Sequence, residues 1–461
     1  MERILRSVEQ EMQTLDLGDE RRNRRAKVLL SSLLNAPGAS IPVACGSRKA
    51  SKAAYRFLSS PISAQALNAA HFDATRQRSK GKGRLLALQD ITSLDFTQRS
   101  KIEGLGPLDS SLCRGLKVQT VLLTTEAGEP LGVLDQRVWA REAEEVGKRH
   151  TRRKRAPREK ESWHWREGFE AVERRLPAES EVIGIGDRES DIYFVLAMPR
   201  RPGFELLIRA AQNRRVQDPE YKYLREAVEA APVLGTYDLK VERTHKRRAR
   251  TAKLEVRATR VVLNPPRHGV KGEKLEPVEV SVVWARECGE VPKGEQRIEW
   301  LLLASWPVES FEEALECIRL YTQRWKVERY HYVLKSGCKI EDLQLLSAAR
   351  LKRALALYSI VAWRLLWLTY KARTAPAMPC TEVLEEDEWR VLLVMTGGSL
   401  GGRDPPSLRE AVHRIAGLGG FQGRKGDGDP GVKALWQGWR RFMDFVLTCR
   451  TLGYAQDVGN A

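Results

Sequence analysis

The spacing of hydrophobic residues changes twice along the chain. The first 80 residues carry apolar residues at helical spacing, as in KVLLSSLL, with Asp19 placed to cap a helix and Pro37-Gly38 placed to end it. Residues 341–461 return to helical spacing, as in LKRALALYSIVAWRLLWL. Their middle, 371–408, is rich in Pro, Gly and acidic residues, so we expect mainly loop there. The pattern predicts a helical region at each end of the chain.

Between these regions, at 81–340, the pattern is that of a mixed α/β domain. The predicted elements follow in the order strand, strand, strand, helix, strand, helix, strand, at 84–96, 116–126, 130–140, 166–176, 181–190, 191–198 and 204–210. The turn-prone AGE between the second and third strands favours an antiparallel meander. Alternating segments at 211–300 break this order and predict a β-rich insertion, after which WLLLASWP resumes the sheet.

Composition and charge narrow the class of protein. The 461 residues hold 78 Lys and Arg against 60 Asp and Glu, a net charge of +18, which favours a large polyanion as partner. A hydrophobic content of 42% excludes a disordered chain. None of the seven cysteines forms a CxxC pair, which argues against a disulfide framework and structural zinc and favours a reducing cytosol.

Two stretches could be mistaken for membrane segments. The N-terminus lacks the apolar core of a signal peptide, and Arg364 interrupts the most apolar stretch, 354–368, which is short for a membrane span. We therefore expect a soluble protein with no membrane partner.

Basic residues cluster in the first helical region. They are Arg21, Arg22, Arg24 and Arg25 on one predicted helix and Lys49, Lys52 and Arg56 on another. Two further basic segments lie at 148–155 and 245–250. Such clusters are commonly solvated charged faces. Together with the overall charge, they favour contact of residues 1–80 with DNA.

Three carboxylates stand out by position. Asp90 and Asp187 each come at the end of an apolar run, and the carboxyl end of a buried strand is where an α/β site forms. Glu328 lies midway along a helix predicted from Phe311 to about Ser336, which Ser310 and Glu313 would cap and Gly337 would end in the C′ position. Each acid alone is weak evidence, since most such residues only start turns or face solvent.

The same helix carries a polar stripe. At 100° per residue, Tyr321, Arg324, Glu328 and Lys335 fall within about 60° of one another. The stripe is either a surface row of ion pairs or one metal-binding carboxylate flanked by phosphate-binding groups. His331 lies nearby, and we interpret it as structural because no second histidine stands at zinc-ligand spacing.

Carboxylate oxygens are ligands that suit Mg²⁺ or Mn²⁺. Two such ions could bind between Asp90, Asp187 and Glu328 and serve phosphodiester chemistry, with the surrounding Arg and Lys offsetting the repulsion between substrate and carboxylates.

These residues carry a resemblance to a known family. Y-x2-R-x3-E-x6-K at Tyr321, Arg324, Glu328 and Lys335, with LALQDITSLDF around Asp90 and GDRESDIY around Asp187, resembles bacterial insertion-sequence transposases of the DDE class. The branch is the one with the YREK signature, and the chain is most similar to its transposon-five type. LGDERRNRR, KAAYRFL and ALWQGW extend the resemblance to both ends of the chain.

The resemblance implies a ribonuclease-H-like mixed sheet at 81–340 with a β-rich insertion at 211–300. It implies a helical DNA-binding domain at 1–80 and a helical dimerisation domain at 341–461. It also implies cut-and-paste transposition: a nick at the transposon end, a hairpin, and joining to target DNA by a homodimer. The inverted-repeat ends and the target would be double-stranded DNA, in the bacterial cytoplasm and its nucleoid.

The resemblance also assigns residues. Asp90, Asp187 and Glu328 would be catalytic and bind metal, and Tyr321, Arg324 and Lys335 would contact phosphates. DNA contacts would further come from Trp300, Arg25, Arg56 and Arg209, with Trp300 stacking on a flipped base unless it only packs in the core. The chain departs from its relatives at Tyr332, where they have a lysine.

Two other functions stay open on the sequence. One is an end-binding transposition inhibitor without catalysis. The other is a ribonuclease-H-like nuclease, although the β insertion and the helical ends argue against so compact an enzyme.

Overall fold

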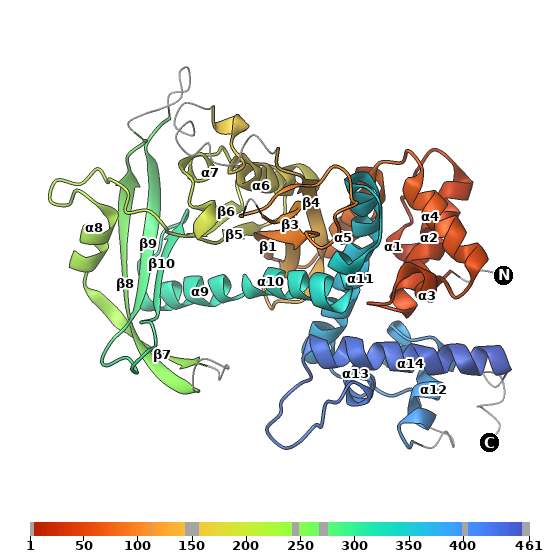
Figure 1. Cartoon of the computed structure of the whole chain (residues 1–461). Coiled ribbons are helices and arrows are strands. Elements are labelled where there is room, and N and C mark those ends of the chain that lie inside the picture. Colours follow the sequence, from red (N-terminus) through yellow and green to blue (C-terminus); the bar gives the residue numbers. More distant parts are fainter. Residues whose placement is uncertain are drawn as a thin grey trace.

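The computed structural model describes residues 4–110, 112–142, 156–241, 249–266, 275–398 and 404–453. Helical regions lie at both ends of the chain and a large mixed sheet lies between them, as Figure 1 shows. The mixed α/β core with helical flanks is therefore confirmed. The basic segment at 148–155 and residues 245–248 of the other lie outside the described residues.

The first helical region packs beside the sheet and against the long helix that follows the core. Its helices are α1 (Arg6–Glu11), α2 (Glu20–Asn35), α3 (Ile41–Cys45), α4 (Arg48–Ser59) and α5 (Ala64–Ser79). Asp19 caps α2 as predicted, because its side chain accepts a hydrogen bond from the backbone N–H of Arg21 at 2.8 Å.

The buried Glu11 and His71 and the half-buried Arg78 form a cluster, the Glu11 cluster, between α1 and α5. Arg78 donates to the two Glu11 oxygens at 2.8 and 3.2 Å, and His71 Nδ1 lies 2.5 Å from Glu11 Oε1. The backbone N–H of Val133 donates to His71 Nε2 at 3.0 Å, so the ring proton is on Nδ1. Burial alone would raise the pKa of Glu11, but Arg78 and His71 outweigh it and lower that pKa to about 2. Burial lowers the pKa of His71, which suits a neutral ring.

Ten strands of the described chain form one sheet, in the order β2-β3-β1-β5-β6-β10-β9-β8-β7 with β4 paired to β3. Strand β1 is antiparallel to β3 and parallel to β5, and β5 is parallel to β6. The run β4-β3-β1-β5-β6 has the ribonuclease-H-like arrangement, with the predicted meander at one side. The bounds are β1 Leu85–Asp95, β2 Gly106–Pro107, β3 Arg114–Thr125, β4 Pro130–Trp139, β5 Val182–Gly186, β6 Phe204–Arg209, β7 Val233–Val241, β8 Arg250–Leu263, β9 Val278–Glu287 and β10 Glu299–Ala304.

The β-rich segment extends this sheet. Strand β10 pairs antiparallel with both β6 and β9, so β7, β8 and β9 continue the core sheet outward. The segment also contains helix α8 (Leu224–Ala230), which we did not predict. Two turns are too short for apolar spacing to distinguish a helix from the strands around it.

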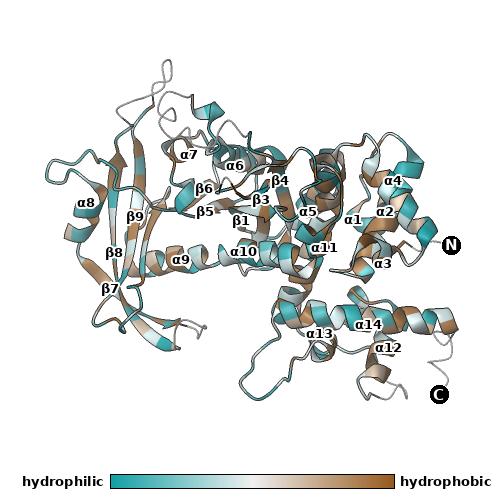
Figure 2. Cartoon of the chain, viewed as in Figure 1, coloured by the Kyte–Doolittle hydropathy of each residue, from teal (hydrophilic) through white to brown (hydrophobic). Residues whose placement is uncertain are grey.

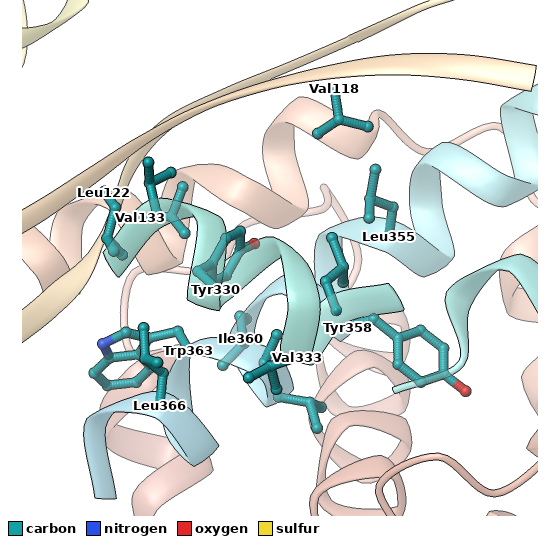
Figure 3. Packing of buried hydrophobic residues seen from close by; sticks show 14 of the residues in the cluster. Val118, Leu122, Val133, Tyr330, Val333, Leu355, Tyr358, Ile360, Trp363 and Leu366 are labelled. Carbon is teal, nitrogen blue, oxygen red and sulfur yellow. The ribbon is translucent and has the colours of Figure 1, made fainter. Parts of the chain in front are cut away.

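Each face of the sheet has its own hydrophobic core. Successive residues of β1 point to opposite faces, so Leu86 and Leu88 pack with the long helices while Leu85 and Ala87 pack with helix α6 (Trp163–Arg175). Figure 3 shows the first of these cores, where Tyr330 and Val333 lie among residues of strands and of the helix that carries Trp363. Short helix α7 (Tyr193–Leu196) lies with α6 on the second face.

The long helix predicted over 311–336 is interrupted in the structure. It consists of α9 (Phe311–Thr322), α10 (Trp325–Tyr332) and one π-helical turn, Val333–Gly337. The N–H groups of Lys326 and Val327 bond three residues back, whereas that of Cys338 bonds five residues back to Val333. Side-chain spacing hardly changes over one such turn, so the apolar pattern could not reveal it. The Ser310–Glu313 capping box is confirmed.

Gly337 does not act as the left-handed C′ residue that we expected. That conformation falls on Lys339, with φ of 52°. Gly337 is instead required by contact, because a Cβ there would lie 2.9 Å from the Trp436 ring. Gly38 has φ of 74°, and a Cβ on it would lie 2.4 Å from the carbonyl oxygen of Gly337. Backbone from the first helical region therefore touches the turn that ends α10.

The last region is helical, as predicted, and has a core of its own. Its helices are α11 (Ala348–Thr374), α12 (Glu386–Met395), α13 (Leu408–Leu418) and α14 (Val432–Leu452). Our expectation of mainly loop over 371–408 is wrong for α12, whose acidic first turn is a helix-start signal that composition alone hid. All seven cysteines are free.

Candidate active site

Two parallel strands bring Asp90 and Asp187 to one edge of the sheet. Strands β1 and β5 are paired from Leu85 with Val182 to Leu88 with Ile185. Asp90 lies two residues past this pairing, and Asp187 follows the last residue of β5. The two carboxylates therefore leave the sheet at the same carboxyl edge, where the sequence predicted a site.

The turn after β5 holds Asp187 in place. Its Oδ1 accepts a hydrogen bond from the backbone N–H of Glu189 at 2.8 Å. Ser190 Oγ donates to the carbonyl of Asp187 at 2.6 Å, and this close return requires a glycine at position 186, where a Cβ would lie 2.2 Å from that hydroxyl. The VIGIGD sequence thus ends in a tight polar turn that presents its acid.

Glu328 joins the other two acids from helix α10. Burial raises its pKa, Arg324 opposes this, and the charges of Asp90 and Asp187 raise it further. Burial also raises the pKa of Asp187, with Asp90 contributing in the same direction. The three acids predicted from the sequence therefore lie within electrostatic range of one another, although more than 200 residues separate the first from the last.

Two of the three carboxylates are bound by groups of the protein, so the three are not yet arranged as ligands of a metal ion. Arg324 binds Glu328 with an N–O distance of 2.6 Å, and Asp187 is bound by a backbone amide. Over the described ranges, no group of three or more His, Cys, Asp or Glu side chains is arranged to hold a metal ion. The acids supply the hard oxygen ligands that Mg²⁺ prefers, together with an excess of negative charge. Glu328 would have to exchange Arg324 for an ion.

Tyr321 and Arg324 lie beside the acids and have unused hydrogen-bonding capacity. Tyr321 is buried, so the stripe is not a surface row of ion pairs. Tyr321 Oη and Arg324 Nε are buried without a hydrogen-bond partner in the described structure. The Trp300 ring lies 6.4 Å from that of Tyr321, and the Arg324 guanidinium lies 5.7 Å from the Tyr321 ring. A buried donor without a partner is costly and is a common mark of a ligand site.

Lys335 lies further along the stripe, on the π-helical turn. Its ammonium lies 3.4 Å from a carboxylate oxygen of Glu341. The pKa of Asp95 is lowered mainly by hydrogen bonds from Thr97 and also by Lys335, which places Lys335 near the end of β1. The structure therefore brings Tyr321, Arg324 and Glu328 together and sets Lys335 at the rim.

Two further residues lie at this edge: His331, which we interpreted as structural from the sequence, and Glu189, which we did not predict. His331 Nδ1 lies 3.5 Å from Asp90 Oδ2, while its Nε2 lies 3.1 Å from the Thr120 hydroxyl. Glu189 is a fourth acid, whose pKa is raised by burial and then by Asp187 and Asp90. The available signal was spacing: His331 is three residues past Glu328 on the same helical face, and Glu189 is two residues past Asp187.

The remaining predicted DNA contacts fall in two places. Arg25 on α2 and the exposed Arg56 on α4 belong to the first helical region. Arg209 ends β6 and donates to the carbonyl of Glu299 at 2.9 Å, next to Trp300 on the adjoining strand. Arg209 and Trp300 thus lie next to the acid edge, the carboxyl edge of the sheet where Asp90, Asp187 and Glu328 lie. Arg25 and Arg56 lie on the N-terminal helices.

A ribonuclease-H-like sheet with acids at its carboxyl edge, between two helical regions, is consistent with the fold of transposases. Comparison with known families agrees at both ends of the chain. Residues 6–62 match the family described as transposase DNA-binding, and residues 360–459 match the Tn5 transposase dimerisation domain. These matches indicate a transposase of the Tn5 type, which binds DNA through its first helices and dimerises through its last ones.

The last helix carries apolar residues suited to such dimerisation. Phe445, Leu447 and Leu452 of α14 are 53%, 43% and 62% exposed, too much for a core role. Figure 2 shows hydrophobic residues at the far end of this helix. No helix in the described ranges has the length and apolar character to cross a membrane.

Proposed function

We propose that this transposase performs cut-and-paste transposition by a metal-dependent reaction at Asp90, Asp187 and Glu328. The observation that carries the proposal is the convergence of these acids at one sheet edge, where the pKa values of Asp187 and Glu328 are raised by burial and by the neighbouring carboxylates. Carboxylates held together against their own repulsion favour a site for positive charge.

The three acids would hold two Mg²⁺ or Mn²⁺ ions. Such ions would lower the pKa of an attacking hydroxyl and offset the charge that develops on the leaving oxygen. The protein's own residues would bind and orient the DNA. Tyr321, Arg324 and Lys335 offer donors to phosphate oxygens, and two of these donors are buried without a partner.

In the first step, water would attack the phosphorus at the transposon end and the 3′-oxygen would leave as a hydroxyl. That 3′-hydroxyl would attack the opposite strand and form a hairpin, which a second water opens. It would finally attack target DNA, and each attack exchanges one phosphorus–oxygen bond for another. Trp300 beside Tyr321 offers a ring on which a base flipped from the stack could lie during hairpin formation.

The Arg324–Glu328 ion pair suggests how DNA and ions enter the site together. Arg324 occupies Glu328 in the protein alone, at 2.6 Å. A DNA phosphate competing for Arg324 would free the Glu328 carboxylate, and a buried arginine with an unused Nε–H is suited to that exchange.

The test uses the full chain with labelled inverted-repeat ends taken from the DNA beside its gene. With Mg²⁺, the proposal expects a nick, then a hairpin, then joining to a target plasmid. Asp90→Asn, Asp187→Asn and Glu328→Gln should each abolish all steps while end binding persists. Mg²⁺ should also raise the melting temperature of the native chain and not that of Asp187→Asn, since a ligand stabilises only what it binds.

The outcomes separate the alternatives. Tight end binding without cleavage, and without stabilisation by Mg²⁺, would favour an end-binding inhibitor. Cleavage of any duplex or RNA–DNA hybrid, without preference for the ends, would favour a ribonuclease-H-like nuclease. Cleavage retained by any one of the acid variants would remove that residue from the site.

A further inference from the structure

A cavity lies on the other face of the same sheet edge. This cavity, of about 670 Å³, is lined by Ile91 of β1, Lys117 of β3, Trp163 of α6 and Phe194 of α7. Its volume is typical of ligand sites, which hold roughly 300–1,000 Å³. Ile91 and its neighbour Asp90 point to opposite faces of β1, so the cavity and the acids are separated by one strand edge.

Glu189 connects the cavity to the acids. It lines the cavity, and it interacts electrostatically with Asp187 and Asp90. Arg188, directly after Asp187, lines the cavity as well. A strand whose phosphate lay at the acids would therefore continue past Arg188 and Glu189 into this cavity.

The cavity offers a stacking surface. Trp163 is half-buried and meets Phe194 edge to face, with ring centroids 6.1 Å apart. The Arg166 guanidinium lies 4.7 Å from the Trp163 ring. Aromatic rings flanked by arginine bind unpaired bases without sequence preference.

The charges of the cavity favour an anion. Six basic side chains line it against four acids, so its net charge is positive. Three of the acids are ion-paired: Asp109 with Lys117 at 2.8 Å, Asp191 with Arg214 at 2.6 Å and Glu161 with Arg141 at 2.6 Å. The fourth acid is Glu189, at the side of the cavity next to Asp187. The exposed Arg188 guanidinium has no ion-pair or hydrogen-bond partner in the part of the chain that the structure describes. A nucleotide needs a ring on which its base can stack and a cation for its phosphate, and this cavity offers both.

We propose that this cavity binds the first unpaired nucleotides of the flanking DNA strand, beyond the scissile phosphate, with a base on Trp163 and a phosphate on Arg188. The proposal rests on the proposed function, and it assigns the transposon side of the cut to Tyr321, Arg324 and Trp300, where phosphate donors and a ring for a flipped base lie. The acids stand between the two sides, so a continuous strand would be bound on both faces of the sheet edge.

The test compares two DNA substrates on the full-length protein. One is a transposon end with flanking DNA still attached, and the other is the same end already cleaved. Trp163→Ala should weaken binding of the flanked end by about 10-fold or more, because base stacking is worth roughly 1–3 kcal/mol. Binding of the cleaved end should not change, and Trp163→Phe should restore most of the loss.

Arg188→Ala should lower the salt dependence of binding to the flanked end alone, by about one unit of slope for one lost phosphate contact. The matched control is Arg260→Ala on β8, where an exposed arginine is paired with Glu279 at 2.7 Å. It should affect neither substrate. A 2-aminopurine at the first flanking position should be quenched in the native complex and bright in that of Trp163→Ala.

Equal losses on both substrates, or no quenching of 2-aminopurine by the native protein, would overturn the proposal. A folding defect in Trp163→Ala would appear as weaker binding of the cleaved end. In that case Trp163→Phe is the test: near-native binding of the flanked end supports the proposal, and a loss on the flanked end with native binding of the cleaved end contradicts stacking by any aromatic ring. Failure of the proposed chemistry is distinguishable, since Mg²⁺ would then produce no nick even though the flanked and cleaved ends still differ in their response to Trp163→Ala.

Discussion

The acid edge and the Glu11 cluster both bury carboxylates, and they treat them in opposite ways. In the Glu11 cluster, Arg78 and His71 meet the carboxylate directly, and the pKa of Glu11 falls to about 2 despite burial. At the acid edge, burial and neighbouring acids raise the pKa values of Asp187 and Glu328. The first arrangement stabilises the folded chain, whereas the second destabilises it at neutral pH.

The difference lies in whether the polar atoms around a buried carboxylate have partners from the chain, which distinguishes a structural carboxylate from one that awaits a ligand. Every polar atom of the Glu11 carboxylate has a partner from the chain, so nothing further is needed. The acid edge leaves negative charge unbalanced and, beside it, leaves Tyr321 Oη and Arg324 Nε without partners. Such unsatisfied groups are expected where a ligand completes the site.

The largest expected effect is on chemistry. Asp187→Asn should reduce nicking by on the order of 10,000-fold, about 5 kcal/mol, since bound ions supply several kcal/mol to such reactions. The same variant should raise the free energy of unfolding by about 1 kcal/mol, because it removes a repelled charge and keeps the amide contact. Gel assays and urea titration measure the two effects. The matched control, Glu181→Gln at the exposed residue just before β5, should change neither. If Asp187→Asn were less stable than the native protein, the charge of Asp187 would not destabilise the folded chain.

Next in size is the loss of the Glu11 carboxylate. Glu11→Ala should lower the free energy of unfolding by about 3 kcal/mol, because it removes the carboxylate partner of the buried His71 and the half-buried Arg78. Urea denaturation followed by circular dichroism measures it. Glu9→Ala is the control on the same helix, since the Glu9–Lys27 pair is half exposed and such pairs contribute about 1 kcal/mol or less. Equal effects of the two variants would show that the Glu11 cluster is not structural.

Acid should destabilise the protein in two stages. Burial lowers the pKa of His71, so the unfolded chain takes up a proton first and stability falls as the pH drops below 6.5. The pKa of Glu11 is lowered from 4.5 to about 2, so its contribution, about 3 kcal/mol, is present above pH 4.5 and is lost between pH 4.5 and about 2. Unfolding curves over this range should show both stages. Glu11→Gln should lack the loss of stability between pH 4.5 and about 2. If the native protein also lacked this loss, the Glu11 carboxylate would not stabilise the fold.

The smallest effect is expected from His331, which contacts one of the three acids and also has a hydrogen-bond partner from the chain. His331 is buried, contacts Asp90 at 3.5 Å and has a partner in Thr120. As a positioning residue, it should affect ion binding more than folding. His331→Gln should raise the Mg²⁺ concentration for half-maximal nicking by about 10-fold, the lower end for residues that support metal ligands. A change in maximal rate without a change in Mg²⁺ requirement would assign it to folding or to DNA.

Much of the fold was accessible from the sequence because buried strands and amphipathic helices have strong periodic signals. The meander, the VIGIG strand and the capped helix at Ser310 were all predicted from such patterns. Features of one or two turns were not: the interruption near Arg324, the π-helical turn and helix α8. These depend on which backbone groups bond to each other, and hydrophobic spacing does not report that.

For the site, the resemblance and the strand ends together pointed to Asp90, Asp187 and Glu328. The sequence could not show that Arg324 holds Glu328, because that contact depends on side-chain rotamers. His331 was set aside since a lone histidine is usually structural, and its nearness to Asp90 arises only when α10 packs on β1. Glu189 had no signal of its own beyond its distance in sequence from Asp187.

Gly337 lies where three regions of the chain come together. The Gly38 backbone from the DNA-binding end lies against its carbonyl, and the Trp436 ring from the dimerising end lies against its Cα. Neither glycine can be enlarged without moving a neighbour that belongs to another region. We therefore expect a saturation mutagenesis screen for transposition to find both positions intolerant, although neither touches an acid. The DNA-binding, central and dimerisation regions of this chain therefore meet at the backbone of one residue, two positions from Lys335.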